Sequence, residues 1–217
     1  MSSPRIAVVR NEVESEYEYH CDALSENVPD AREIDFPVGE RLDPGAVDGV
    51  VLTGSTAGVY ERSDRPWIDD QRRLVEELVE REIPTLGVCF GHQVVNDALG
   101  GSVENVGTTA RLVAAEFEDD PLFDGVSPVV PAVHGDAVTA VGDGMEVIAS
   151  ADYYPAFATR HRNAPLWTVQ FHPEFTAGLR GRLEADFGWT DSDLRFEDAN
   201  ATRVFENFGS IVEDSTA

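Results

Sequence analysis

The ten residues from Pro84 to Gln93 read PTLGVCFGHQ. An apolar run ends at Cys89, and Gly87 and Gly91 lie two residues to either side of this cysteine. Where a strand passes directly into a helix, the residue at the junction is held in a strained backbone conformation. Side chains two positions before or after this residue would collide with the turn, so glycine is favoured there. The stretch therefore predicts a strand that passes directly into a helix, with the Cys89 side chain at the apex.

The same stretch has the spacing of a nucleophile elbow, in which a glycine stands two residues before and two residues after the nucleophile. In open α/β sheets such a side chain lies above the carboxyl ends of the strands, where ligands bind. The positive end of a helix that begins near Phe90 would favour a thiolate at Cys89. A small apolar cysteine that fills a tight strand–helix junction is the alternative interpretation.

Apolar runs bounded by turn residues predict the strands of a main sheet. They lie at Ile6–Val9, Val47–Leu52, Thr85–Val88 and Leu166–Phe171. Three of them precede plausible helices, and the clearest helix, Trp67–Arg81, carries one apolar stripe. This alternation predicts an α/β fold with three layers, a mostly parallel central sheet with helices on both faces.

The rest of the chain is expected to complete one domain. Between Gly101 and Arg160 the pattern changes to short alternating runs, which predict a small antiparallel sheet attached to the main one. A last helix is expected over about residues 201–212, and the polar, acidic residues 186–199 are expected to form a surface insertion. No repeat or linker interrupts the sequence, so residues 1–217 are predicted to form a single domain.

The composition is strongly acidic. The chain has 16 basic and 41 acidic residues, a formal net charge of -25, and every basic residue is an arginine. Self-repulsion of this size would strain a compact fold in dilute buffer, and molar salt would screen it. The composition therefore predicts a halophilic protein, with an acidic mesophilic protein as the alternative. Because no basic stripe is present, nucleic acid is not expected as a partner.

Localisation and cofactor use follow from what the sequence lacks. No apolar run approaches the roughly 18 residues of a membrane span, and Met1–Pro4 leads straight into the first apolar run without a signal segment. A cytoplasmic protein without membrane contact is therefore expected. Two cysteines make no disulfide framework, and the five histidines show no metal-ligand spacing, so neither a metal nor a cofactor is expected.

A thiol nucleophile needs a base, and His172 is the candidate. It follows a predicted strand in the stretch TVQFHPE. Glu174, two residues later, can accept a hydrogen bond from the imidazole, as the third member of a catalytic triad does. A structural histidine at a strand end is the alternative. Because His-Pro-Glu occurs together with the cysteine elbow, we predict that Cys89, His172 and Glu174 form a catalytic triad.

Acyl transfer also needs hydrogen-bond donors for the developing oxyanion. The amide of Phe90, directly after the nucleophile, is one candidate. Gly54 is the second, in the turn Thr53-Gly54-Ser55-Thr56 after a predicted strand, because a glycine lets the backbone approach a ligand closely. A loose Gly/Ser turn is the alternative interpretation.

With L-T-G-S, P-T-L-G-V-C-F-G-H-Q and Q-F-H-P-E in this order, the chain resembles class I glutamine amidotransferases, the group with a Cys-His-Glu triad. The resemblance covers nearly the whole chain and implies the flavodoxin-like α/β fold of that class. It implies that Cys89 attacks the side-chain amide of glutamine and forms a γ-glutamyl thioester. His172 would protonate the departing ammonia and then activate the water that releases glutamate.

The resemblance also implies contacts to the substrate. Gln93 would lie in the glutamine pocket. His134, Gly135 and Asp136 would lie on the loop that holds the α-amino and carboxylate ends of the substrate. His92 would be a packing residue that shares the motif, not a second base.

Within the class, the chain is most similar to the amidotransferase part of GMP synthetase and its free-standing relatives. Two stretches depart from that synthetase: its S-G-G-P turn is replaced by Thr53-Gly54-Ser55-Thr56, and Val-x-His-Thr after His-Pro-Glu is replaced by Phe175-Thr176-Ala177. No S-G-G-x-D-S pyrophosphatase loop occurs, and the absence of lysine excludes a P-loop. The sequence therefore predicts glutamine hydrolysis that supplies ammonia to a separate synthetase, with GMP synthesis as one acceptor reaction.

Two alternatives remain open at the level of sequence. A γ-glutamyl peptidase or hydrolase uses the same triad on γ-glutamyl peptides and breaks the same kind of acyl bond, so the sequence does not separate it from a glutaminase. The second alternative is a non-catalytic regulatory or interaction protein that binds a partner through its acidic surface. The intact Cys89, His172 and Glu174 argue against this second alternative.

Overall fold

The computed structural model describes residues 4–216, so residues 1–3, where no signal segment is expected, lie outside the described range. The strands are β1 (Ile6–Arg10), β2 (Arg32–Asp35), β3 (Gly49–Leu52), β4 (Thr85–Val88), β5 (Ser102–Phe117), β6 (Val129–Ala140), β7 (Met145–Ala151), β8 (Tyr154–His161) and β9 (Leu166–Val169). The helices are α1 (Tyr19–Ser25), α2 (Trp67–Glu80), α3 (Phe90–Ala98), α4 (Arg180–Phe187) and α5 (Arg203–Thr216). None of these helices is long and apolar enough to cross a membrane.

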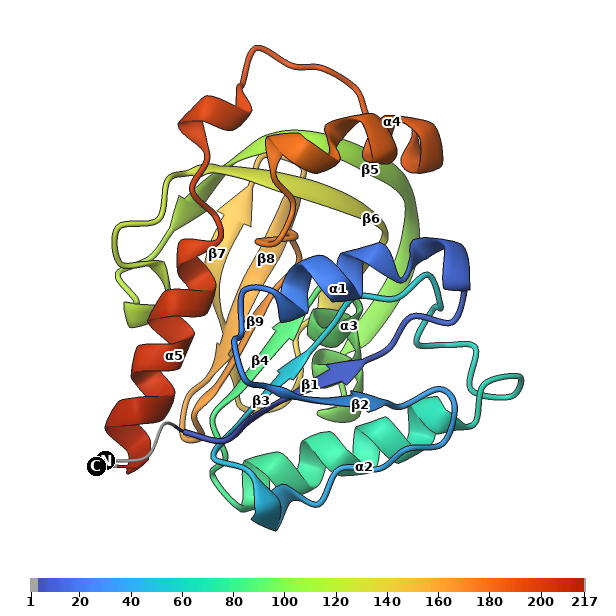
Figure 1. Ribbon diagram of the computed structural model, residues 1–217, viewed down its shortest axis with the longest axis vertical. Helices are drawn as coiled ribbons and strands as arrows, with labels where there is room; N and C mark the ends of the chain where they lie inside the picture. The colour runs from blue at the N-terminus through green and yellow to red at the C-terminus, as the bar shows by residue number, and fades with distance from the viewer. Residues whose placement is uncertain (1–3, 217) are drawn as a thin grey trace.

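The strands form a nine-stranded sheet in the order β2-β1-β3-β4-β9-β8-β7-β5-β6 (Figure 1). The strands from β2 to β9 in this order pair in parallel, and the remaining pairs are antiparallel. Strands β3, β4 and β9 are buried along their whole length, as expected for parallel strands covered on both faces. The predicted α/β fold with a mostly parallel centre is confirmed.

Helices cover both faces of the parallel half. Helices α1 and α5 pack on one face, and α2 and α3 pack on the other (Figure 1). The alternation of side chains along a strand divides the core accordingly. In β1, Val8 packs in the cluster of α1 and α5, whereas Ala7 and Val9 pack in the cluster of α2 and α3. The predicted three-layer arrangement is therefore confirmed.

The antiparallel half is attached to the main sheet, as the alternating pattern predicted, because β8 pairs with β9. Its largest element is the long pair β5–β6, with a register shift between Asn105 and Thr109. The first half of β5 is mostly exposed, and β6 is buried from Val129 to His134. This long pair forms one wall of the site described below.

The end of the chain differs from expectation in two details. The last helix, α5, begins at Arg203 and continues to Thr216, beyond the predicted end near residue 212. Residues 186–199 are largely exposed, but they are not purely a surface feature. Trp189 is buried in the cluster that contains Leu183 and Phe175, and its ring stacks on that of Phe196 with centroids 5.4 Å apart. An isolated tryptophan in a polar run carries no periodicity, so the sequence did not show this contact.

The strand–turn–helix predicted around Cys89 is present between β4 and α3. Cys89 has φ 53° and ψ -102°, and α3 begins at the next residue. A Cβ atom on Gly87 would lie 2.6 Å from the Gly91 carbonyl oxygen, and one on Gly91 would lie 2.5 Å from the Leu52 carbonyl oxygen. Both glycines are therefore required because the backbone approaches them too closely for any side chain.

Substitution of Gly91 tests this close approach. We expect Gly91→Ala to lower the free energy of unfolding by about 1–3 kcal/mol, because the added methyl group must displace buried backbone. Gly209 lies in α5, and a methyl group added to it would meet no atom within 4 Å. As the matched control, Gly209→Ala should raise stability by about 0.5–1 kcal/mol. Urea unfolding measures both changes, and a Gly91→Ala protein as stable as the wild type would contradict the packing argument.

Candidate active site

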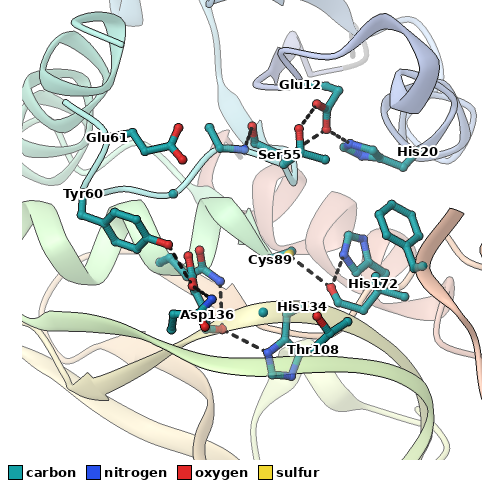
Figure 2. Close-up of a pocket in the computed structure, with 18 of the residues that line it drawn as sticks. Glu12, His20, Ser55, Tyr60, Glu61, Cys89, Thr108, His134, Asp136 and His172 are labelled. Atoms are coloured by element: carbon teal, nitrogen blue, oxygen red, sulfur yellow. Dashed lines mark hydrogen bonds and ion pairs between the residues drawn. The ribbon is translucent and has the colours of Figure 1, made fainter. Parts of the chain in front are cut away.

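A pocket of about 260 Å³ opens where β1, β3, β4 and β9 end (Figure 2). Cys89 lies at its base, and His172 lies beside it. The pocket is lined from seven places in the chain: the segments after β1, β3 and β9, the start of α3, the β5–β6 pair, and helices α1 and α4. The polar side chains among its lining residues are Glu12, His20, Ser55, Thr56, Tyr60, Glu61, Gln93, Asn105, Thr108, His134, Asp136 and His172.

The three residues of the predicted triad lie together. Nδ1 of His172 is 2.6 Å from Oε1 of Glu174, and both side chains are buried. On the other side of the ring, Nε2 lies 3.1 Å from the carbonyl oxygen of Val133, and this same oxygen lies 3.6 Å from the sulfur of Cys89 (Figure 2). Both ring nitrogens of His172 thus face acceptors, an arrangement that suits the imidazolium form.

The surroundings of His172 favour its protonated form. Burial by itself would lower the pKa of His172, but the charges of Glu174 and Cys89 outweigh it and raise this pKa well above its ordinary value. The ring of Phe175 lies parallel to the imidazole, with centroids 4.3 Å apart and an interplanar angle of 6°, and covers one face of it. A protonated, oriented imidazole next to a thiol is the arrangement that stabilises a thiolate.

The two candidate oxyanion donors lie next to this pair. A Cβ atom on Gly54 would be 3.1 Å from Cε1 of His172 and 3.6 Å from Cβ of Cys89, so the backbone of Gly54 lies against both side chains. Phe90 follows Cys89 as the first residue of α3. Within residues 4–216, no backbone acceptor receives the amide N–H of Gly54 or of Phe90. Both residues are buried, and neither is among those that line the pocket.

The predicted substrate residues lie on the opposite side of the sulfur. The side-chain amide of Gln93 donates to the carbonyl of Asp136, at 3.2 Å, and to Oε1 of Gln170, at 3.3 Å. The carboxylate of Asp136 accepts hydrogen bonds from Asn105, at 2.9 Å, and from the hydroxyl of Tyr60, at 3.3 Å. Figure 2 shows the hydroxyl of Tyr60 pointing toward Asp136.

The structure places His134, Gly135 and Asp136 inside strand β6, whereas the resemblance implied a loop, because His134 and Asp136 pair with β5. His134 is buried, with Nδ1 3.0 Å from the carbonyl of Asp136 and Nε2 2.9 Å from the hydroxyl of Tyr153. Burial, together with the positive charge of His172, lowers the pKa of His134 to about 4. His134 is therefore neutral at pH 7, and Gly135, beside it, lines the pocket without a side chain.

His92 lies away from the pocket, inside the protein. Its ring nitrogens are 2.7 Å from the hydroxyl of Thr168 and 3.0 Å from that of Tyr154. Burial lowers the pKa of His92 to about 3, so the ring stays neutral. These contacts join α3 to β8 and β9, as a packing residue would.

Several residues of the site were not found from the sequence, among them Tyr60 and Asn105, which bond Asp136, and Gln170, Glu12 and His20. Gln170 donates from Nε2 to the sulfur of Cys89 at 3.5 Å, and its only signal is its place two residues before His172 in QFHPE. Glu12 and His20 form a second buried carboxylate–imidazole pair, 2.8 Å apart, within the same pocket. Burial would lower the pKa of His20, but Cys21 and Glu12 raise it to about 10. Glu12 and His20 lie in an acidic stretch of sequence that resembles a solvated surface. No motif or spacing therefore identified them as residues of the site.

Comparison with known proteins agrees with this geometry. The model of the family Glutamine amidotransferase class-I matches residues 10–187. The chain is 38% identical over 167 residues to a glutamine-hydrolysing GMP synthase of Parafrankia sp., covering 74% of this chain and 29% of that protein. It is 34% identical over 168 residues to the glutamine-hydrolysing GMP synthase of Thermobifida fusca, covering 75% and 29%. The chain thus spans less than a third of the length of these relatives.

Solved structures show the same fold. A glutamine amidotransferase of Thermotoga maritima matches with a TM-score of 0.74 at 23% identity, covering 99% of each chain. One of Methylobacillus flagellatus matches with a TM-score of 0.75 at 14% identity, covering 98% of this chain and 95% of that one. The matched family region contains the Cys89 elbow and the His-Pro-Glu stretch. The chain therefore belongs to the class I glutamine amidotransferases.

Proposed function

We propose that this protein hydrolyses the side-chain amide of glutamine, with Cys89 as nucleophile, His172 as general acid and base, and Glu174 as the residue that orients His172. One observation carries the proposal: the elbow presents Cys89 in a pocket beside an imidazole that Glu174 holds at 2.6 Å. A nucleophile, a base and an orienting carboxylate are the three parts that acyl transfer to a thiol requires.

The reaction follows from these positions. The Cys89 thiolate attacks the amide carbon, and the N–H groups of Gly54 and Phe90 stabilise the oxyanion that forms. The imidazolium of His172 gives its proton to the amide nitrogen, the C–N bond breaks, and ammonia leaves a γ-glutamyl thioester. His172, now neutral, takes a proton from water, which attacks the thioester and releases glutamate and the Cys89 thiolate.

The other end of the pocket would hold the amino-acid part of the substrate. Asp136 offers a carboxylate to the α-ammonium group, and the backbone at Gly135 is open to the pocket. Gln93 and the neutral His134 fix the position of this part of β6 through the carbonyl of Asp136. The hydroxyl of Tyr60 donates a hydrogen bond to Asp136. The ammonium group of the substrate would replace this hydroxyl as a donor to Asp136.

The ammonia would pass to a separate synthetase. The curated relatives are named glutamine-hydrolysing GMP synthases, which supports GMP synthesis as the acceptor reaction. Since this chain covers 29% of each of those proteins, the acceptor step would belong to a part of the assembly outside these 217 residues. We further propose a cytoplasmic, salt-adapted protein that binds neither nucleic acid nor membranes, on the basis of its net charge of -25.

The nucleophile assignment predicts the effect of Cys89→Ser. We expect glutamate release to fall to background, because a serine at this position lacks the thiolate that attacks the amide. The unfolding midpoint should stay at the wild-type value. A glutamine analogue that carries an electrophile should label Cys89 in the wild type and leave the variant unmodified. Turnover by Cys89→Ser would show that another group is the nucleophile.

The role of His172 predicts a graded loss. His172→Asn should lower kcat by about 10²–10⁴-fold, because proton transfer to the leaving nitrogen is lost. Folding is monitored by the unfolding midpoint, as above. An unchanged kcat would mean that another base serves Cys89.

The substrate assignment separates a glutaminase from a γ-glutamyl peptidase. We expect kcat/KM to be higher for free glutamine than for a γ-glutamyl dipeptide when both are measured in molar salt. Glutamate release serves as the readout for both substrates. A clear preference for the dipeptide would replace the ammonia-supplying function with peptide hydrolysis.

The charge excess predicts salt-dependent stability. At about 1 M salt the Debye length is about 3 Å, and at about 0.1 M it is about 10 Å, so repulsion among the carboxylates grows as salt is removed. We expect the thermal unfolding midpoint to fall, or the protein to aggregate, when KCl is lowered between these concentrations. Equal stability at both salt concentrations would contradict the halophilic assignment.

A further inference from the structure

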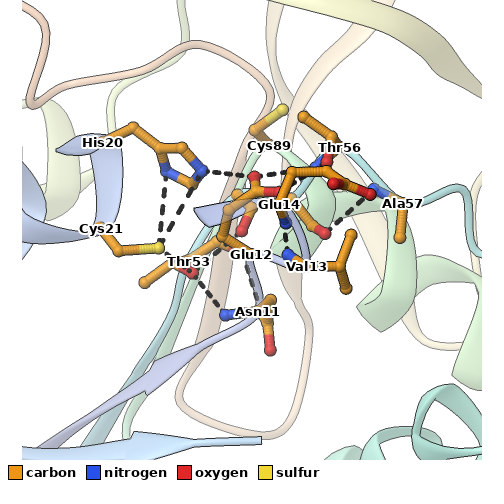
Figure 3. A network of polar contacts seen from close by, with 12 residues as sticks. Asn11, Glu12, Val13, Glu14, His20, Cys21, Thr53, Thr56, Ala57 and Cys89 are labelled. Atoms are coloured by element: carbon orange, nitrogen blue, oxygen red, sulfur yellow. Dashed lines mark hydrogen bonds and ion pairs between the residues drawn. The ribbon is translucent and has the colours of Figure 1, made fainter. Parts of the chain in front are cut away.

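The loop after β1 contacts the turn after β3 through a buried polar network (Figure 3). Strands β1 and β3 are parallel neighbours, so their carboxyl ends meet at the same edge of the sheet. The side chain of Asn11 donates to the carbonyl of Thr53 at 3.0 Å, and the hydroxyl of Thr53 donates to the carbonyl of Gly54 at 2.9 Å. The two carbonyl groups on either side of the Gly54 α-carbon are thereby held.

Glu12 holds the other end of the same turn. Its carboxylate accepts two hydrogen bonds from Thr56, one from the backbone N–H at 3.0 Å and one from the hydroxyl at 2.5 Å. It also accepts from the N–H of Val13, at 2.8 Å, and that of Glu14, at 2.9 Å. The ring of His20 supplies a fifth contact at 2.8 Å.

These five contacts decide what Glu12 can do. A carboxylate has about four lone-pair positions, and groups of the protein already occupy them. Although Glu12 lines the pocket, it has no free lone pair with which to bind a substrate ammonium group. A buried, fully bonded carboxylate instead fixes the groups that bond to it. Glu12 therefore acts on the pocket through the turn that it holds.

The turn has little room to move. A Cβ atom on Gly54 would lie 3.4 Å from Cε1 of His20 and 3.1 Å from Cε1 of His172. The two imidazole rings meet edge to face, with centroids 6.1 Å apart and an interplanar angle of 77°. Gly54 is thus packed against both rings, one held by Glu12 and the other by Glu174.

We propose that Glu12 is a positioning residue, which holds the Gly54 N–H at the place where the oxyanion develops, by bonding Thr56 and His20. This inference rests on the proposed function, because the oxyanion exists only if Cys89 attacks an acyl group. Donors of this kind act on the transition state much more than on the bound substrate.

The decisive variant is Glu12→Gln. In either orientation of the glutamine amide, its NH₂ group faces N–H or O–H donors of the protein. Two donors repel each other, so the Thr53–Thr56 turn must shift. We expect kcat for glutamine to fall by about 10–100-fold, in line with a misplaced rather than a deleted donor, while KM changes by less than about threefold. The rate at which iodoacetamide alkylates Cys89 should stay within about twofold of the wild type, because alkylation forms no oxyanion.

Glu14→Gln is the matched control. Glu14 is an exposed acid two residues away, it does not line the pocket, and the variant removes the same charge. Its kcat, KM and alkylation rate should equal those of the wild type. Equal losses in Glu14→Gln and Glu12→Gln would show a general effect of charge and would overturn the proposal.

Thr56→Ala provides a second measurement, and it decides the question if Glu12→Gln does not fold. It removes one donor to Glu12 and should lower kcat by about 3–10-fold with KM and alkylation unchanged. In the double variant the losses should not multiply, because both changes act on one contact. An unchanged kcat in both single variants, or a parallel loss of alkylation, would overturn the positioning role while the wild type still hydrolyses glutamine. A wild type that releases no glutamate would instead overturn the proposed function, and this inference with it.

Discussion

The active site depends on the contact between three backbone segments at the end of β4. Gly91 lies against the carbonyl of Leu52, and Gly87 lies against the carbonyl of Gly91, with no room for a side chain at either glycine. This approach brings α3 directly onto the edge of the sheet and leaves Cys89 with a φ of 53°. Two backbone hydrogen bonds hold Cys89 in this conformation. The carbonyl of Cys89 accepts from the N–H of Gln93, and the N–H of Cys89 donates to the carbonyl of Val169. Cys89 is thus oriented by main-chain packing, before any side chain contributes.

Two carboxylate–imidazole pairs lie near Cys89 and have different partners. Glu174 bonds the ring of His172, which also faces the Val133 carbonyl, and Glu12 bonds the ring of His20 and the turn at Thr56. Both rings pack against Gly54. The turn after β3 reads Thr53-Gly54-Ser55-Thr56. The threonine at the last position has an N–H, and Glu12 accepts a hydrogen bond from it. Glu12 thus holds this turn through Thr56.

Local patterns predicted the parts of the fold and site that depend on neighbours in sequence. The elbow around Cys89, the strand ends and the helix Trp67–Glu80 follow from glycine spacing and apolar periodicity. The pairing of Glu12 with Thr56 joins residues 44 positions apart, and a glutamate in an acidic run resembles solvated surface. The burial of Trp189 likewise depends on where α4 and the β5–β6 pair lie. Contacts of this kind arise from the assembled fold, so a single sequence without periodicity at those positions does not contain them.

The long β5–β6 pair has a consequence for how the site is assembled. Strand β6 stands four places from β9 in the sheet, yet its Pro131 accepts the N–H of His172 and its Val133 carbonyl faces the imidazole. The sheet must curl until its last strand returns to the ends of its central strands. The position of the Val133 carbonyl, which both the sulfur of Cys89 and the ring of His172 face, therefore depends on the curvature of the sheet. The bend of the antiparallel half is as much a part of the catalytic geometry as the side chains themselves.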